Sequence, residues 1–362
     1  MKKPDSNKKV GWQRILLIVL CVVLTLALVA LITVAIVLDD WLGRVERVDP
    51  NLESTMSSEE ASRWDAENQA TETIPSDAVT VDPSDVVWED PTDSTDPTGG
   101  TAEIDLIGDE EHIVNILLIG TDRRSTGERG RSDAMSLCTF NKQTNEFTMT
   151  SFLRDLYVQI PGYQDNRINA AYSYGGMNLL RQTLEKNFHV YVDGCVVVDF
   201  SSFTTVIDWV GGVGISLTQA EADHLNAQNS SWSLVKGSNW LNGEQALAYS
   251  RIRALDSDFG RTNRQRTVLS ALVRSAVSLS PGRMLSAAKS ILSLVSTDLS
   301  DAEILGYVTE LFPILVSAEL QTQAIPAMDR FENVYIRGMA VLYMNPENME
   351  ATRQFLRETL LG

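Results

Sequence analysis

Cysteine and histidine are both scarce in this sequence, with three of each among 362 residues. Three thiols are too few for the framework of disulfides that stabilises many secreted domains. The histidines stand far apart along the chain, at His112, His189 and His224, without the close spacing of metal-ligand pairs. Any chemistry in this chain is therefore expected to use carboxylates and guanidinium groups.

Several familiar catalytic and phosphate-binding motifs are also missing. GTDRRSTG lacks the Lys-Ser/Thr ending of a phosphate-binding P-loop, and GGVGI opens no dinucleotide-binding βαβ unit. The sequence has no G-x-S-x-G element, which excludes the nucleophile elbow of serine hydrolases. These absences exclude the familiar nucleotide-binding sites and the serine-hydrolase active site.

Basic residues are few as well: 30 Lys and Arg face 48 Asp and Glu, for a formal charge of −18. That charge is unevenly distributed. Residues 39–111 carry a net charge of −19, residues 1–38 carry +4, and the remainder carries only −3. Local basic clusters in the C-terminal part can therefore attract an anionic ligand despite the acidic total.

The N-terminus has the pattern of a membrane anchor. Residues 1–14 form a basic tail, and residues 15–38 then run without a charge. A helix of that length spans roughly 36 Å, against about 30 Å for a hydrocarbon core. A cleaved signal peptide is the alternative, but its apolar region would be shorter and followed by a small-x-small cleavage site. We expect a retained transmembrane helix with the N-terminus in the cytoplasm and the rest of the chain outside the cell.

Residues 39–111 are predicted to form a disordered, acidic, extracellular spacer, because Ser, Thr, Asp, Glu and Pro dominate and no periodicity is sustained. Trp64 and Trp88 are its only hints of docking, and a short helix is possible around SSEEASRWDAENQA.

From residue 112 to residue 362 apolar runs alternate with amphipathic stretches, which predicts an α/β fold: a single α/β/α layered domain with a central mixed sheet. IVNILLI is typical of a strand covered on both faces. AMSLCTF and EFTMTSFL are expected to be strands joined by the turn NKQTN. Cys138 and Cys195 lie in strand-like runs and are expected to be buried free thiols, although the sequence leaves a bridge between them open.

A first charged cluster is expected at the end of this sheet. Asp122 follows the apolar strand at its C-terminal edge, where open α/β sheets place ligands. If the turn is centred near Gln143, paired strand positions have numbers that sum to about 287, so Asp133 faces Arg154. Arg131, Asp133, Arg154 and Asp155 are then candidates for one cluster. The alternative is an ordinary surface salt-bridge network.

A second cluster lies in YSRIRALDSDFGRTNRQRTVL. Arg251 and Arg253 end one helix, and Arg261 opens the next. Three- and four-residue steps place Arg261 and Gln265 on the otherwise apolar inner face of that helix, together with Val268, Leu272 and Ala276. Arg264 and Arg266 leave this face and are expected to be structural or exposed.

Together the two clusters predict a pyrophosphate and a metal ion. A buried arginine at a helix N-terminus requires an anionic partner. Paired arginines recognise phosphate, and two aspartates suit Mg²⁺, which prefers oxygen ligands and shares phosphate oxygens.

Seven ordered motifs carry a resemblance to a known family: NILLIGTDRR, RSDAM, SFLRDLYVQIPG, RINAAYSYGG, VDFSSFTTVIDWVGGV, LNGEQALAYSRIR and DFGRTNRQR. Over residues 112–279 the chain resembles the LytR–CpsA–Psr family. That resemblance implies a membrane-bound transferase of a Gram-positive-type cell envelope. Such enzymes move a glycopolymer, such as a teichoic acid or capsule, from a polyprenyl-pyrophosphate carrier to peptidoglycan, leaving a phosphodiester.

The resemblance also assigns roles to residues. Asp122 and Asp133 correspond to the carboxylates associated with Mg²⁺ (or Mn²⁺). The set that binds pyrophosphate corresponds to Arg131, Arg154, Arg251, Arg253, Arg261 and Gln265. FLRD departs from the family's proline-arginine-aspartate, which loses a rigid turn but keeps the arginine. The nearby Arg123, Arg124 and Arg129 lie in a loop that varies within the family, and either face the substrate or are solvated.

The implied mechanism has two catalytic aspartates, Asp122 and Asp133, and the arginine Arg154. Asp133 takes the proton from the acceptor sugar hydroxyl, or the metal activates that hydroxyl directly. A polyprenyl-pyrophosphate pyrophosphatase and a non-enzymatic envelope sensor or transcriptional attenuator are the alternatives. Nucleic acid is excluded as a partner because the arginine-rich region is expected outside the membrane.

Overall fold

The computed structural model describes residues 42–49, 53–68, 74–88, 105–121, 130–256, 258–280, 283, 290 and 293–362. The expected transmembrane helix at 15–38 lies outside these residues. Among the helices that are described, none is long and apolar enough to cross a membrane.

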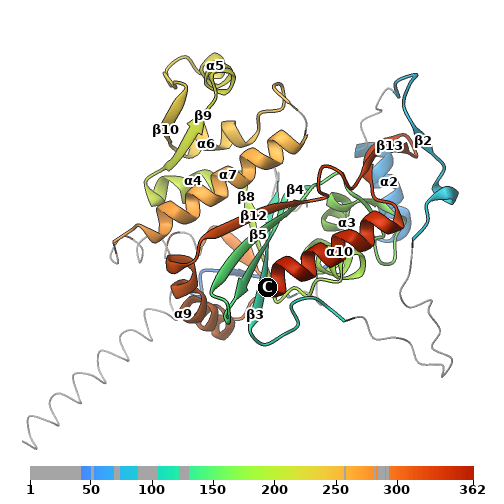
Figure 1. The fold of residues 1–362 in the computed structure, drawn as a ribbon, viewed down its shortest axis with the longest axis horizontal. Coiled ribbons are helices and arrows are strands. Elements are labelled where there is room, and N and C mark those ends of the chain that lie inside the picture. The colour runs from blue at the N-terminus through green and yellow to red at the C-terminus, as the bar shows by residue number, and fades with distance from the viewer. Residues whose placement is uncertain are drawn as a thin grey trace, which may run out of the picture. The chain divides into compact units, whose positions relative to one another are not determined.

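A seven-stranded mixed sheet forms the centre of the domain, as predicted (Figure 1). Its order is β1-β11-β8-β3-β4-β5-β12. Antiparallel pairs join β3 to β4 and β4 to β5, whereas β3 pairs with β8, and β5 with β12, in parallel. The strands are β1 (Glu46–Arg47), β3 (Ile113–Thr121), β4 (Ser132–Asn141), β5 (Glu146–Phe152), β8 (Gly194–Asp199), β11 (Val295–Thr297) and β12 (Leu320–Ile325).

Helices cover both faces of this sheet, which confirms the layered arrangement. Leu117 and Leu137 point to the layer that contains α3 (Ile168–Phe188) and α10 (Pro346–Leu361). Their neighbours Ile116 and Cys138 point to the opposite layer, which contains α7 (Asp258–Val277) and α9 (Asp301–Ser317). The near-continuous apolar run in β3 is thus explained by burial on both faces.

Three smaller sheets extend the domain. Strands β9 (Val213–Leu217) and β10 (Gly237–Leu241) pair and pack with α4 (Phe200–Val210), α5 (Gln219–Gln228) and α6 (Gly243–Ser250) around a core of their own. A three-stranded sheet joins β2 (Thr80–Val81), β13 (Glu332–Ile336) and β14 (Met339–Tyr343). The short strands β6 (Tyr157–Val158) and β7 (Asn166–Arg167) form another pair.

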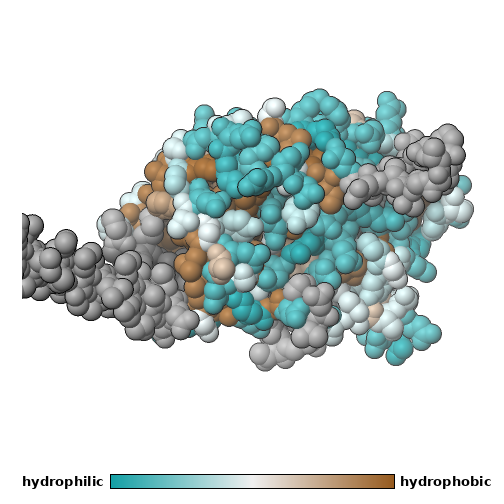
Figure 2. Space-filling model, turned by 90° about the horizontal axis from the view of Figure 1, so that it is seen from below, coloured by the Kyte–Doolittle hydropathy of each residue, from teal (hydrophilic) through white to brown (hydrophobic). Residues whose placement is uncertain are grey.

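The surface of the molecule is mostly hydrophilic on the face drawn in Figure 2, with apolar side chains gathered in separate areas. On α9, an exposed apolar stripe is formed by Val308, Phe312 and Val316.

Cys138 and Cys195 are both buried free thiols, as expected. They lie on β4 and β8, on either side of β3, and belong to the cores on opposite faces of the sheet. Burial raises the pKa of each thiol to about 12. A bridge between them would have to pass through the sheet.

The prediction of a disordered spacer over 39–111 is wrong for part of its length. Residues 58–68 form helix α2 (Ser58–Asn68), and residues 80–81 add β2 to the domain, parallel to β13. A short 3₁₀ helix (Pro83–Asp85) follows β2. Ala61 of α2 is buried in the main core, and Trp64 and Trp88 pack against it. The folded domain therefore begins well before residue 112.

Candidate functional site

The hairpin between β4 and β5 has the predicted register and brings Asp133 to Arg154. Met135 pairs with Phe152, and the pairing continues to Asn141 and Glu146. Two residues beyond the Met135–Phe152 pair on each strand, Arg154 Nη1 donates to Asp133 Oδ1 over 2.9 Å. Both side chains are about one-fifth exposed, at 20% and 19%. The RSD and LRD motifs therefore meet at one end of the sheet.

Asp155 and Arg167 extend this cluster. Arg154 Nε donates to Asp155 Oδ2 over 3.3 Å, and Arg167 Nε lies 3.7 Å from Asp155 Oδ1. Arg167 Nε also donates to the backbone oxygen of Ala340 over 3.0 Å. Arg167 was not among the predicted site residues, although it opens the RINAAYSYGG motif. Its proximity depends on the β6–β7 pair, which sequence spacing alone did not reveal.

Arg131 lies beside the same cluster and is held against an aromatic ring. Its guanidinium carbon is 4.8 Å from the centre of the Trp64 ring. Burial lowers the pKa of Arg131, and the positive charges of Arg167 and Arg154 lower it further. The three arginines are thus close enough to repel one another, an arrangement that an anionic ligand would stabilise.

Helix α7 carries Arg261 and Gln265 towards this end of the sheet. Arg261 is in the first turn and is only 3% exposed. It lines a cavity of 320 Å³ together with Arg154 and Asp155. Gln265, one turn later, lines a different, apolar pocket. Arg261 is thus buried and Gln265 half-buried against the domain, as predicted, and the structure adds that they line different cavities.

The apolar pocket has a volume of 260 Å³ and lies between the sheet and helices α4, α6 and α7. Its walls are mainly aliphatic and aromatic, with Val196, Phe203 and Leu272 among them. Gly120 and Ala134 line it as well, and Ala134 directly follows Asp133 in β4. One wall of the pocket is therefore formed by the β4 residue next to Asp133 in the chain.

The loop after α6 presents Arg251 and Arg253. Both side chains are exposed, and the Arg251 guanidinium lies 4.7 Å from the centre of the Phe200 ring, which lines the apolar pocket. The intervening Ile252 is buried. Its backbone oxygen accepts a hydrogen bond of 2.9 Å from Arg264 Nη2.

Arg264 therefore holds the loop, as expected for a structural arginine. Its Nη1 donates to Asp256 Oδ2 over 2.9 Å, and its Nη2 donates to Asp256 Oδ1 over 2.5 Å. Nη1 also reaches Glu221 Oε1 on α5, at 3.4 Å. Arg266, by contrast, is half-buried and donates to Asn263 one turn earlier.

We expect Arg264→Ala to lower the free energy of unfolding by roughly 2–3 kcal/mol, because it leaves Glu221 and the Ile252 carbonyl oxygen without their charged donor. Arg266→Ala should cost less than about 1 kcal/mol. Urea denaturation of the two variants measures the difference. Equal losses would mean that Arg264 does not anchor the loop.

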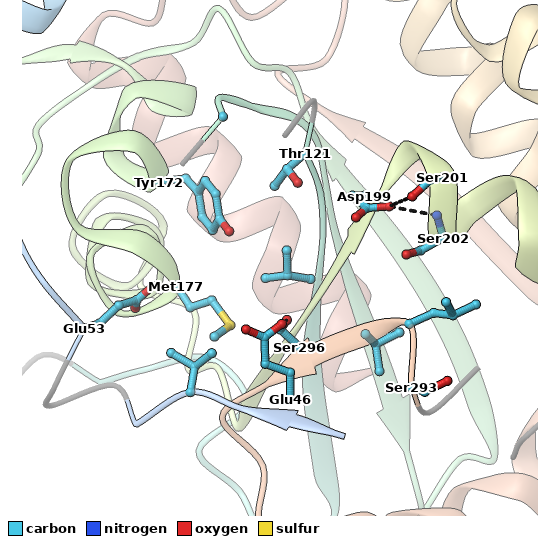
Figure 3. Close-up of a pocket in the computed structure, with 15 residues that line it drawn as sticks. Glu46, Glu53, Thr121, Tyr172, Met177, Asp199, Ser201, Ser202, Ser293 and Ser296 are labelled. Atoms are coloured by element: carbon cyan, nitrogen blue, oxygen red, sulfur yellow. Dashed lines mark hydrogen bonds between the residues drawn. The ribbon is translucent and has the colours of Figure 1, made fainter. Parts of the chain in front are cut away.

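A polar cavity of 510 Å³ lies on the α3 side of the sheet, at the ends of β3 and β8 (Figure 3). Thr121, Tyr172 and Asp199 line it, and Asp199 caps α4 by accepting a hydrogen bond from the backbone nitrogen of Ser202 over 2.8 Å. Thr121 and Gly130 are the described residues on either side of 122–129. Asp122, with Arg123, Arg124 and Arg129, lies outside the described residues, and its predicted position stays a prediction.

The chemistry of Asp133 fits a divalent cation. A carboxylate has several lone-pair directions, so accepting one hydrogen bond from Arg154 does not prevent it from ligating Mg²⁺. Within the ranges that the structure describes, no group of three or more potential His, Cys, Asp or Glu ligands is found. A magnesium ion here would take its remaining ligands from Asp122, phosphate oxygens or water.

Known proteins resemble this chain in sequence and fold. The model of the LytR_cpsA_psr family matches residues 76–358. Regulatory protein MsrR of Staphylococcus aureus is 32% identical over 250 residues, or 68% of this chain and 75% of MsrR. The polyisoprenyl-teichoic acid–peptidoglycan teichoic acid transferase TagU of Oceanobacillus iheyensis is 38% identical over 186 residues, or 49% of this chain and 56% of TagU. A structure of the LytR-CPS2A-psr family protein YwtF (TagT) with bound octaprenyl pyrophosphate lipid has a TM-score of 0.54 at 28% identity, covering 69% of this chain and 91% of that one.

Proposed function

Because this chain belongs to the LytR–CpsA–Psr family, we propose that it transfers a glycopolymer from a polyprenyl-pyrophosphate carrier to a sugar hydroxyl of peptidoglycan, forming a phosphodiester. The relative TagU is named as a teichoic acid transferase, and the similar YwtF structure contains a polyprenyl pyrophosphate. The name of TagU favours a cell-wall teichoic acid as the glycopolymer.

The observation that carries the proposal is the junction between the apolar pocket and the charged hairpin end. A polyprenyl pyrophosphate has a long hydrocarbon chain and a doubly charged head. The apolar pocket suits the chain, and Ala134 in its wall is bonded directly to Asp133. Arg154, paired with Asp133, lines a second cavity together with Arg261, and these arginines suit the pyrophosphate.

In the reaction, the acceptor hydroxyl attacks the phosphorus attached to the glycan, and the bond to the lipid-bound phosphate breaks. The arginines stabilise the negative charge that develops on the departing lipid phosphate. Asp133 takes the proton from the hydroxyl, and the hydrogen bond from Arg154 fixes the orientation of that carboxylate. Mg²⁺, when bound by Asp133 and Asp122, would neutralise phosphate charge and could activate the hydroxyl in place of Asp133.

The expected setting is the outer face of a cell membrane, with residues 15–38 as a single anchor and the domain outside the cell. This placement brings the lipid carrier and the peptidoglycan acceptor within reach of one domain. The regulatory alternative is supported by the relative MsrR, which is named as a regulatory protein. A carboxylate oriented by an arginine favours the enzyme, since a sensor has no need of a base.

The proposal is tested by giving the full chain, in detergent micelles, a polyprenyl-pyrophosphate glycan, Mg²⁺ and peptidoglycan fragments, and separating the products. We expect the glycan on peptidoglycan and no transfer after addition of a chelator. Release of lipid phosphate without a linked product would identify a pyrophosphatase. Binding of the lipid-linked glycan without turnover would support the non-enzymatic sensor instead.

A further inference from the structure

Helix α2, which precedes the expected domain, is built to dock on α3. Its N-terminus has a capping box, because the backbone nitrogen of Ser57 donates to Glu60 Oε2 over 2.7 Å and that of Glu60 donates to Ser57 Oγ over 3.2 Å. The backbone nitrogen of Met56 donates to the oxygen of Tyr174 on α3 over 2.8 Å. The hydroxyl of Tyr163 donates to the Met56 oxygen. Both the nitrogen and the oxygen of Met56 are thus hydrogen-bonded to later residues, and α2 lies beside α3 (Figure 1).

The docked face of α2 presents Trp64 and Asp65. The Trp64 ring meets the Tyr174 ring edge to face, with centroids 6.3 Å apart. Asp65 Oδ2 accepts hydrogen bonds from the Tyr174 hydroxyl, over 2.6 Å, and from Asn166 Nδ2, over 2.8 Å. Burial raises the pKa of Asp65, while the hydrogen bond from Tyr174 and the charge of Arg131 act in the opposite direction.

We propose that Trp64 and Asp65 are positioning residues for Arg131, so that the segment before the domain completes the pyrophosphate site. The inference rests on the proposed function, which assigns Arg131 to pyrophosphate binding. Trp64 lies against the guanidinium of Arg131, with 4.8 Å between the guanidinium carbon and the ring centre. No step of the proposed reaction uses a residue of α2. Holding Arg131 in place would give this helix a function in the site.

The physical reason is the charge of the neighbouring arginines. Arg167 and Arg154 repel Arg131 and favour its departure to solvent. The Trp64 ring attracts the guanidinium through its π electrons and, unlike a carboxylate, has no oxygen lone pairs to occupy the N–H donors. The ring can therefore restrain Arg131 while the N–H donors of the guanidinium remain available to a phosphate. Asp65 adds a compensating charge without replacing the phosphate, because its bonded partners are Tyr174 and Asn166.

A double-mutant cycle on the full chain in micelles tests the inference, with geranylgeranyl pyrophosphate as the probe in calorimetry. We expect Trp64→Ala to weaken binding about tenfold, within the range of a partly desolvated cation–π contact. In an Arg131→Ala background, Trp64→Ala should have almost no further effect, because its action passes through Arg131. Trp64→Phe keeps a ring and should recover most of the affinity.

Trp88→Ala is the matched control. Trp88 is also in the N-terminal segment, but it packs on Tyr157 and donates to Asp165 over 2.7 Å. This variant should lose thermal stability and keep its affinity for the probe. Additive losses from Trp64→Ala and Arg131→Ala, or equal losses in both tryptophan variants, would overturn the inference. If the unmodified chain does not bind the probe, the proposed function fails instead.

Discussion

Replacing Asp133 with alanine should abolish transfer, with a loss of at least about a thousandfold in kcat, because the substitution removes a base and a metal ligand together. The carboxylate lies at the end of β4, where the hydrogen bond from Arg154 orients it. Affinity for polyprenyl pyrophosphate should fall much less, since the arginines remain. Single-turnover transfer and calorimetry on the same variant separate the two effects.

Two further variants identify what Asp133 does. Asp122→Ala should also abolish transfer, but excess Mg²⁺ should restore part of it if that residue only holds the ion. Excess Mg²⁺ should not restore Asp133→Ala if Asp133 is the base. Asp223→Ala, on the exposed face of α5, is the control and should keep normal transfer. An Asp133→Ala enzyme that retains a tenth of its activity would rule out both roles.

Arg261→Ala and Gln265→Ala should each weaken polyprenyl-pyrophosphate binding far more than Arg266→Ala. Loss of a charge-assisted contact from Arg261 should cost roughly 1.5–3 kcal/mol, or about 10- to 150-fold in Kd. Arg261 is buried beside Arg154 in the 320 Å³ cavity, and Gln265 lines the apolar pocket. Arg266 leaves that face of α7 and contacts Asn263.

Calorimetry on the three variants measures this difference, and their thermal unfolding serves as the control for folding. Arg266→Ala is the matched control for Arg261→Ala, because both variants remove an arginine side chain from α7. Equal losses of affinity in all three variants would mean that the face of α7 has been assigned wrongly.

Short-range patterns were sufficient for the parts of the site that belong to one hairpin or one helix. The turn at NKQTN determines which residues pair, so the contact between Asp133 and Arg154 could be predicted before the fold was known. The periodicity of α7 likewise separates Arg261 from Arg266. It does not predict the burial of Arg264, which is only 4% exposed because it bonds Asp256 and Glu221 outside the helix. In both cases one local element determines the geometry.

Contacts between distant elements could not be predicted in this way. The acidic composition around α2 is typical of a spacer, and the helix gains its place from hydrogen bonds to Tyr174 and Tyr163 of a later segment. The Ser57 and Glu60 capping box was the available signal for the helix, but not for its docking. Arg167 was missed for the same reason, because its position depends on the β6–β7 pair and on Ala340 of β14.

The central claim, that the chain joins a glycan phosphate to peptidoglycan, is tested most directly by the phosphorus in the product. ³¹P NMR should be recorded on the peptidoglycan fragments after reaction with the full chain, the lipid-linked glycan and Mg²⁺. The account predicts a phosphodiester resonance on the acceptor that is absent with Asp133→Ala. Phosphomonoester resonances alone, with an acceptor free of phosphorus, would contradict it and identify hydrolysis.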